Sequence, residues 1–95
     1  MLIVFLKFSE NKAMAAEFMA AHNAWIQQGL NDGVFLLVGG LKPNAGGCII
    51  AHETSKELLQ QRVNEDPFVQ EKIVSADIVE ISPSRVDERL SFLMS

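Results

Sequence analysis

The chain has 95 residues, which suits one domain and leaves no room for a second hydrophobic core. Hydrophobic residues make up 48% of the chain, and the formal net charge is −4. This charge argues against binding to nucleic acids or anionic membranes, because both are recognised largely through neutralisation of phosphate groups by basic side chains. No apolar run approaches the roughly 20 residues that a membrane-spanning helix needs.

The chain has one cysteine, Cys48, so no intrachain disulfide can form. No Cys/His spacing typical of a metal site occurs either. We therefore expect no metal and no other cofactor, and a reducing, cytoplasmic setting. Cys48 itself is interpreted as a small core residue rather than a nucleophile.

The N-terminal half predicts a strand, a helix and a second strand. Leu2 to Phe8 is rich in the β-branched and aromatic residues typical of strands. Lys12 to Gln28 contains no glycine or proline, which favours a helix, and Gly29 is placed to end it. After the turn signal Asn31-Asp32-Gly33, the residues from Val34 to Gly40 predict the second strand.

The next segment predicts a hairpin followed by a helix. Pro43 to Gly47 forms a loop of hairpin size, and Cys48 to His52 is the third predicted strand. Thr54 followed by Glu57 is the pattern of a capping box, so we expect a second helix to start here.

The end of the chain predicts a short helical turn, a fourth strand and an extension. Asp66-Pro67 interrupts the second helix and is suited to cap a further turn from Phe68 to Ile73. Ala76 to Ile81 is the fourth predicted strand. We expect residues 1–83 to form the domain and residues 84–95 to form a C-terminal extension, either a short amphipathic helix or an arm.

This order of elements predicts a ferredoxin-like α+β fold, with both helices on one face of an antiparallel sheet. Successive side chains of a strand point to opposite faces of a sheet, and both sets are apolar in the first strand, as Val4 and Phe5 illustrate. The second strand shows the same pattern. We therefore predict a homodimer in which two sheets pack face to face, and the alternative is a monomer whose C-terminal arm folds over the sheet.

His22 stands out in the first predicted helix. On a helical wheel it lies near the middle of an apolar sector. That sector contains Met14, Phe18, Ala21, Trp25 and Ile26. One interpretation is a core histidine that bonds to a backbone carbonyl, because an unsatisfied buried polar group costs about 1–3 kcal/mol. The other is a pocket histidine that acts as general acid or base.

Asp66 is the leading candidate to orient that histidine, since a catalytic imidazole commonly has a carboxylate partner. Its alternative role is structural, because Asp at the N-cap with Pro at the first helical position is a common device. The two roles are partly compatible, as a capping carboxylate has spare lone pairs. An apolar wall of Phe18, Trp25 and Phe68 would then bind substrate, and the backbone of Gly39 or Gly40 would bind a substrate oxygen.

Three segments together resemble the YciI-like (YCII-related) family. They are Ala21–Ile26, Gly33–Gly40 and Asn64–Phe68. The resemblance runs from Met1 to about Ile81. It implies a ferredoxin-like fold, a dimeric α+β barrel, and a pocket around a helix histidine and the aspartate of an Asp-Pro-aromatic motif, which correspond here to His22 and Asp66.

The resulting hypothesis is a small-molecule enzyme that uses His22 and Asp66 for elimination, isomerisation or hydrolysis of a small organic acid or lactone. Most members of the family have no established reaction, and a similar protein acts as a dehydrochlorinase on a chlorinated muconolactone. One alternative is a non-catalytic module that binds a small ligand in the same pocket. Another is a cofactor-using monooxygenase of the dimeric α+β barrel class, either haem-degrading or quinone-oxidising.

Overall fold

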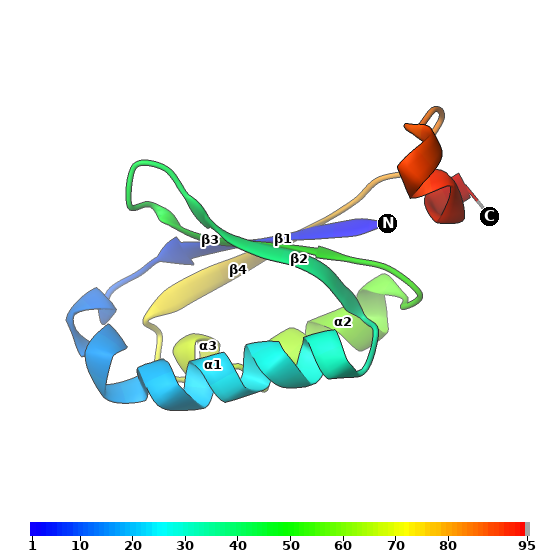
Figure 1. Ribbon diagram of the computed structural model, residues 1–95. Coiled ribbons are helices and arrows are strands. Elements are labelled where there is room, and N and C mark those ends of the chain that lie inside the picture. Colours follow the sequence, from blue (N-terminus) through cyan, green and yellow to red (C-terminus); the bar gives the residue numbers. More distant parts are fainter. Residues whose placement is uncertain (95) are drawn as a thin grey trace.

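The computed structural model describes residues 1–94 and has the predicted ferredoxin-like α+β architecture (Figure 1). Its elements are β1 (Leu2–Phe8), the 3₁₀ turn η1 (Lys12–Met14), α1 (Ala15–Asn31), β2 (Phe35–Leu41), β3 (Gly46–Ala51), α2 (Lys56–Val63), α3 (Pro67–Gln70), β4 (Val74–Glu80) and the 3₁₀ segment η2 (Glu88–Met94). The strands form one antiparallel sheet in the order β2-β3-β1-β4. Figure 1 shows α1, α2 and α3 together on one side of this sheet.

The helix-facing side of the sheet forms the hydrophobic core. Leu2 and Val4 of β1 lie opposite Ala51 and Ile49 of β3, and all four are buried. Every second residue of a strand shares a face, so these side chains point toward the helices together. The helices contribute Leu59, Val63 and Phe68 to the same cluster.

Helix α1 differs from its prediction at both ends. It starts after η1, and it continues through Gly29 to Asn31, so the prediction that Gly29 ends the helix is wrong. Gly29 is buried against the ring of Phe35, and a Cβ atom at this position would overlap that ring. Close packing therefore explains the glycine, and the chain turns instead at Gly33, which has a φ of 74°.

The caps of the two shorter helices follow the expected chemistry with one correction. The N-cap of α2 is Ser55, whose hydroxyl oxygen accepts a hydrogen bond from the Leu58 backbone N–H at 3.1 Å, whereas the sequence pattern predicted Thr54. Helix α3 is capped by Asp66 and has Pro67 at its first position, but it ends at Gln70 rather than continuing to Ile73. The other predicted boundaries differ from the observed ones by one or two residues.

The far side of the sheet faces away from helices α1, α2 and α3 (Figure 1), and it carries apolar side chains. Ile3 of β1 lies between Ile50 of β3 and Val79 of β4, and Leu37 of β2 pairs with Ile50. Leu37 is 52% exposed. We call this side the open face of the sheet.

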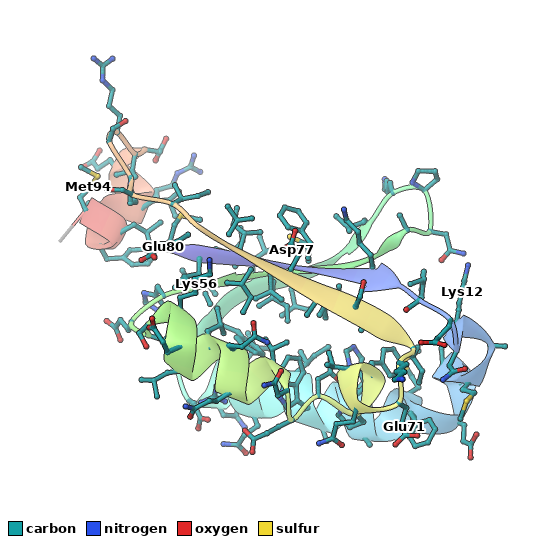
Figure 2. The ribbon with its side chains drawn as sticks, turned by 180° about the vertical axis from the view of Figure 1, so that it is seen from behind. Lys12, Lys56, Glu71, Asp77, Glu80 and Met94 are labelled. Atoms are coloured by element: carbon teal, nitrogen blue, oxygen red, sulfur yellow. The ribbon has the colours of Figure 1, made fainter. Side chains whose placement is uncertain are left out.

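The C-terminal arm, residues 84–94, lies beyond the end of the sheet that holds the N-terminus (Figure 1), and Figure 2 shows Met94 there from behind. Two backbone hydrogen bonds between Met1 and Ile81 hold the chain beside β1 just before the arm begins. A cavity of about 300 Å³ separates the arm from the open face. It is lined by Met1, Leu36, Leu37, Ile50, Leu90, Phe92 and Leu93. The arm thus borders one end of the open face and leaves the remainder uncovered.

Within residues 1–94, no helix combines the length and apolar character that crossing a membrane requires.

Candidate functional site

Helix α1 places His22 against α3 and the sheet, where only 9% of the residue is exposed. The residue before it, Ala21, is exposed, so the apolar sector drawn on the helical wheel is narrower than predicted. Glycine apart, His22 is the only buried residue of this helix. A helix whose one deeply buried side chain is an imidazole needs a polar partner for that ring.

Asp66 is the partner of His22. The Oδ1 atom of Asp66 lies 2.8 Å from Nδ1 of His22, although 44 residues separate the two in sequence. The same oxygen accepts a hydrogen bond from the backbone N–H of Phe68 at 3.0 Å, which caps α3. One carboxylate oxygen therefore holds both the helix terminus and the imidazole, so the structural and the functional interpretation of Asp66 are compatible.

The second carboxylate oxygen, Oδ2 of Asp66, is fully enclosed and has no hydrogen-bond partner among the described residues. Asp66 as a whole is 0% exposed. An enclosed polar group without a partner costs about 1–3 kcal/mol, and more when it is charged. A positive charge on the adjacent imidazole would offset part of that cost, since opposite charges attract strongly in a region of low dielectric constant.

Phe68 fixes the plane of the imidazole. Its ring stacks on His22 with the centroids 3.9 Å apart and the planes 3° from parallel. Phe68 follows Asp66 by two residues, so the short helix α3 supplies both the hydrogen-bond acceptor and the stacking surface. The imidazole is consequently held in position and orientation by one segment of the chain, as preorganised catalysis requires.

The hydrogen bond to Asp66 also determines which nitrogen carries the proton. Because a carboxylate only accepts, Nδ1 of His22 is the donor, and the neutral ring then has its free lone pair on Nε2. Nε2 has no hydrogen-bond partner in residues 1–94. Unlike Oδ2 of Asp66, it is not fully enclosed, so it retains contact with solvent. This nitrogen is available to accept a proton from a bound molecule.

A cavity of about 180 Å³ lies beside His22. Its wall is formed by Leu6, Phe8, Met19, His22, Asn23, Gly46, Gly47 and Phe68. The wall is mainly apolar, and the side chains of His22 and Asn23 are its polar groups. Small-molecule sites commonly combine an apolar wall with a few polar groups that orient the ligand.

The structure brings only some of the predicted site residues to this cavity. His22 and Phe68 line the cavity. Asp66 does not line it but is hydrogen-bonded to His22, and Phe18 packs against the core outside the cavity wall. Trp25 donates its Nε1–H to the Arg62 carbonyl at 3.0 Å and also lies outside the wall.

Gly39 and Gly40 are likewise absent from the cavity wall. A β-bulge between Phe35 and Leu37 shifts the alternation of β2, so Gly39 faces the open side of the sheet. The glycines that do line the cavity are Gly46 and Gly47 of β3. The prediction chose Gly39 and Gly40 over these two, because the choice depends on the register that pairs Gly47 with Leu6 of β1.

The described residues contain no group of three or more His, Cys, Asp or Glu side chains placed to hold a metal ion. Cys48 is a free cysteine on β3, opposite Phe5 on the open face, rather than part of the helix-facing core. The chemistry that these residues supply is thus that of the imidazole and its carboxylate.

Comparison with known proteins places the chain in a family. The family model described as the YCII-related domain matches residues 1–83. The chain belongs to the YCII-related family. The resemblance found in the sequence is thereby confirmed, and the arm lies outside the matched region.

A solved structure shows the same fold in another protein. It is the 5-chloro-2-hydroxyhydroquinone dehydrochlorinase TftG from Burkholderia phenoliruptrix AC1100, in complex with 2,5-dihydroxybenzoquinone. The TM-score is 0.68 at 16% sequence identity, and the match covers 85% of this YCII-related chain and 93% of TftG. At this identity the likeness establishes the fold alone. The search of curated proteins found no match.

Proposed function

We propose that this YCII-related protein is a small-molecule enzyme in which His22 and Asp66 perform general acid/base chemistry. The observation that carries the proposal is that the two ring nitrogens of His22 have different surroundings. Nδ1 of His22 lies 2.8 Å from the enclosed carboxylate, Nε2 has no hydrogen-bond partner in residues 1–94, and His22 lines an apolar cavity. A buried base of this kind is oriented before substrate arrives, which is how general-base catalysis gains its rate.

In the proposed reaction, Nε2 of His22 removes a proton from the bound molecule, and the carboxylate of Asp66 stabilises the imidazolium that forms. In an elimination, the electron pair of the broken C–H bond forms a double bond and a leaving group departs with its own pair. In an isomerisation, the imidazolium returns the proton to a different atom. In a hydrolysis, the proton comes from a water molecule whose oxygen attacks the carbonyl carbon, and the imidazolium gives that proton to the leaving oxygen as the acyl C–O bond breaks.

Elimination is the preferred class, because TftG, which shares the fold, is described as a dehydrochlorinase. The substrates we propose are small organic acids, lactones or ring compounds that the cavity can enclose. A non-catalytic module would bind the same molecules through the same wall without turning them over, so turnover discriminates between the two functions.

The test uses a panel of chlorinated hydroxyhydroquinones and small lactones, with chloride release or loss of lactone absorbance as the readout. We expect His22→Ala, and His22→Asn, which retains a donor for Asp66, to lower kcat/KM about 10²–10⁴-fold. Asp66→Asn should cause a loss in the same range, because the amide oxygen can still accept both hydrogen bonds but the negative charge is gone.

The second histidine of the chain, His52, supplies the control. It lies beside Phe92 of the arm, 5.6 Å between ring centroids, and away from the cavity wall. His52→Ala should leave turnover unchanged. Wild-type activity in His22→Asn would contradict the proposed base, and binding of the panel without any turnover by the wild type would favour the non-catalytic module.

We also propose that two copies of the chain associate through the open faces of their sheets. Ile3, Leu37, Ile50 and Val79 form an apolar surface there, and half-exposed Leu90 and Phe92 of the arm extend it at one end. A contiguous apolar surface of this kind is uncommon on a monomer and is stabilised when a partner covers it. A second copy is the natural occupant, because sheets pack well face to face.

Sedimentation at micromolar concentration tests the association with two matched variants. Leu37→Lys places a charge on the open face, and we expect it to weaken the dimer by at least about tenfold because the charge would be buried without a partner. Leu58→Lys makes the same exchange on α2, where Leu58 is 59% exposed, and should leave the mass unchanged. A monomeric wild type would refute the dimer without affecting the His22 mechanism.

A further inference from the structure

The cavity beside His22 exists because side chains are missing from the helix-facing side of the sheet at one end. One cross-strand row on this side pairs Val4 of β1 with Ile49 of β3, and Ile49 with Val38 of β2. The next row toward the hairpin pairs Leu6 with Gly47, and Gly47 with Gly40. The row continues from Leu6 to Ala76 of β4, so two of its four positions have no side chain, and this leaves space beneath helix α1.

The two glycines that line the cavity are there for different reasons. Gly46 has a φ of 123°, and a Cβ atom on it would overlap the Leu6 backbone oxygen, so the backbone itself requires glycine. Gly47 is not among the residues with positive φ. A Cβ atom on Gly47 would lie 3.5 Å from the Gly39 oxygen and 4.0 Å from side-chain atoms of Leu6, which are ordinary contacts. The backbone at position 47 therefore accepts a residue with a Cβ atom.

A side chain at position 47 would point into the cavity. Residue 47 shares its face with Ile49 and Ala51, both of which are buried beneath the helices. Gly47 already lines the cavity with its main chain. We infer that Gly47 is a specificity-determining residue, whose missing side chain provides the space in which the ligand binds beside His22. This inference deepens the proposed function and rests on it, because it takes the cavity to be the substrate site.

The size of the space defines the ligand class. A cavity of about 150 Å³ lined by apolar side chains takes up benzene, so the 180 Å³ beside His22 suits one six-membered ring with small substituents. Phe8 and Phe68 contribute apolar atoms to the wall, Nε2 of His22 can accept a hydrogen bond from a ring hydroxyl, and the Asn23 amide can donate one to a carbonyl or carboxylate oxygen. The ligand class is therefore a single ring that carries hydroxyl, carbonyl or carboxylate oxygens.

Calorimetric titration of the full chain tests the assignment with named probes. The single-ring probes are 2,5-dihydroxybenzoquinone and benzoate, and the two-ring probe is 2-hydroxy-1,4-naphthoquinone. We expect the wild type to bind at least one single-ring probe and to bind the two-ring probe at least about tenfold more weakly. Gly47→Ala should weaken the single-ring probe about tenfold, and Gly47→Val should abolish its binding, because each added methyl group occupies space that the ring needs.

Two further variants separate cavity size from general disturbance of the sheet. Met19→Ala removes a partly exposed side chain from the opposite wall and should improve binding of the two-ring probe relative to the single-ring probes. Ser75→Thr adds one methyl group to β4 at an exposed position that pairs with Lys7, on the open face, and should change no affinity. Thermal unfolding shows whether Gly47→Val is folded, and valine favours a strand.

Wild-type affinity in folded Gly47→Val, an equal loss in Ser75→Thr, or no binding of any single-ring probe to the wild type would each overturn the assignment. Failure of the proposed catalysis is a separate outcome. It would appear as absent turnover with the dependence of binding on residue 47 intact.

Discussion

The two ends of the helix–sheet interface use glycine in opposite ways. At the end near the C-terminus of α1, the ring of Phe35 occupies the space that Gly29 leaves, and Phe35 is only 3% exposed. At the other end, no side chain of residues 1–94 occupies the space that Gly47 leaves, and a cavity results. Glycine thus allows dense packing at one end and leaves a cavity at the other. The difference is that an aromatic ring packs against Gly29, whereas no side chain of residues 1–94 packs into the space at Gly47.

The N-caps of the two short helices show the same contrast. Ser55 caps α2 with its hydroxyl, at an exposed position with no further role in the described contacts. Asp66 caps α3 with a carboxylate oxygen that also holds His22, and it is fully buried. The neutral hydroxyl of Ser55 is sufficient to stabilise a helix terminus. The carboxylate of Asp66 can also stabilise a positive charge on the imidazole of His22.

The largest effect on stability should come from closing the space at the packed end. Gly29→Ala would place a methyl group in the volume of the Phe35 ring, which is held edge-on by Trp25 with 5.2 Å between ring centroids. Overpacking of this kind costs about 1–3 kcal/mol, even though alanine is the better helix former. Urea unfolding should therefore show a lower midpoint for Gly29→Ala than for the wild type.

Gly47→Ala is the comparison that sharpens this result. It should leave the free energy of unfolding unchanged or slightly higher, because the new methyl group meets only ordinary contacts, while it changes ligand affinity. Gly29→Ala should do the reverse, lowering stability without altering the relative affinities for single-ring and two-ring probes. If Gly29→Ala were as stable as the wild type, the Phe35 ring would be able to move aside. The conclusion that Gly29 is required for close packing would then be wrong.

The order of the strands and helices could be predicted because each segment has the composition of its element. The β-branched residues of Leu2–Phe8 and the capping chemistry of Asp66-Pro67 are local signals, and both led to the observed structure. Gly29 misled the prediction because helix propensity amounts to only about 1 kcal/mol, which tertiary packing against Phe35 readily outweighs.

The pairing of His22 with Asp66 in the candidate site could be predicted from the sequence, whereas the residues that line the neighbouring cavity mostly could not. His22 was noticeable as a polar residue on an apolar helix face, and the resemblance to the YCII-related family pointed to Asp66 as its partner. The walls depend on strand register, which the sequence does not show. A single bulge in β2 turned Gly39 to the open face, and the pairing of Leu6 with Gly47 placed Gly47, rather than the predicted Gly39 or Gly40, at the cavity beside His22.

The cap of α2 should affect stability alone, by less than the overpacking at Gly29. Ser55→Ala removes the acceptor for the Leu58 backbone N–H, which should lower the free energy of unfolding by about 1 kcal/mol. Because Ser55 is exposed and touches neither His22 nor the cavity wall, binding of the single-ring probes and turnover should both equal those of the wild type. Thermal unfolding and the calorimetric titration measure the two quantities side by side. A change in turnover without a change in stability would contradict this expectation, because it would mean that the cap of α2 influences His22. Ser55 and Asp66 cap different helices, and in the described contacts only Asp66 bonds to His22.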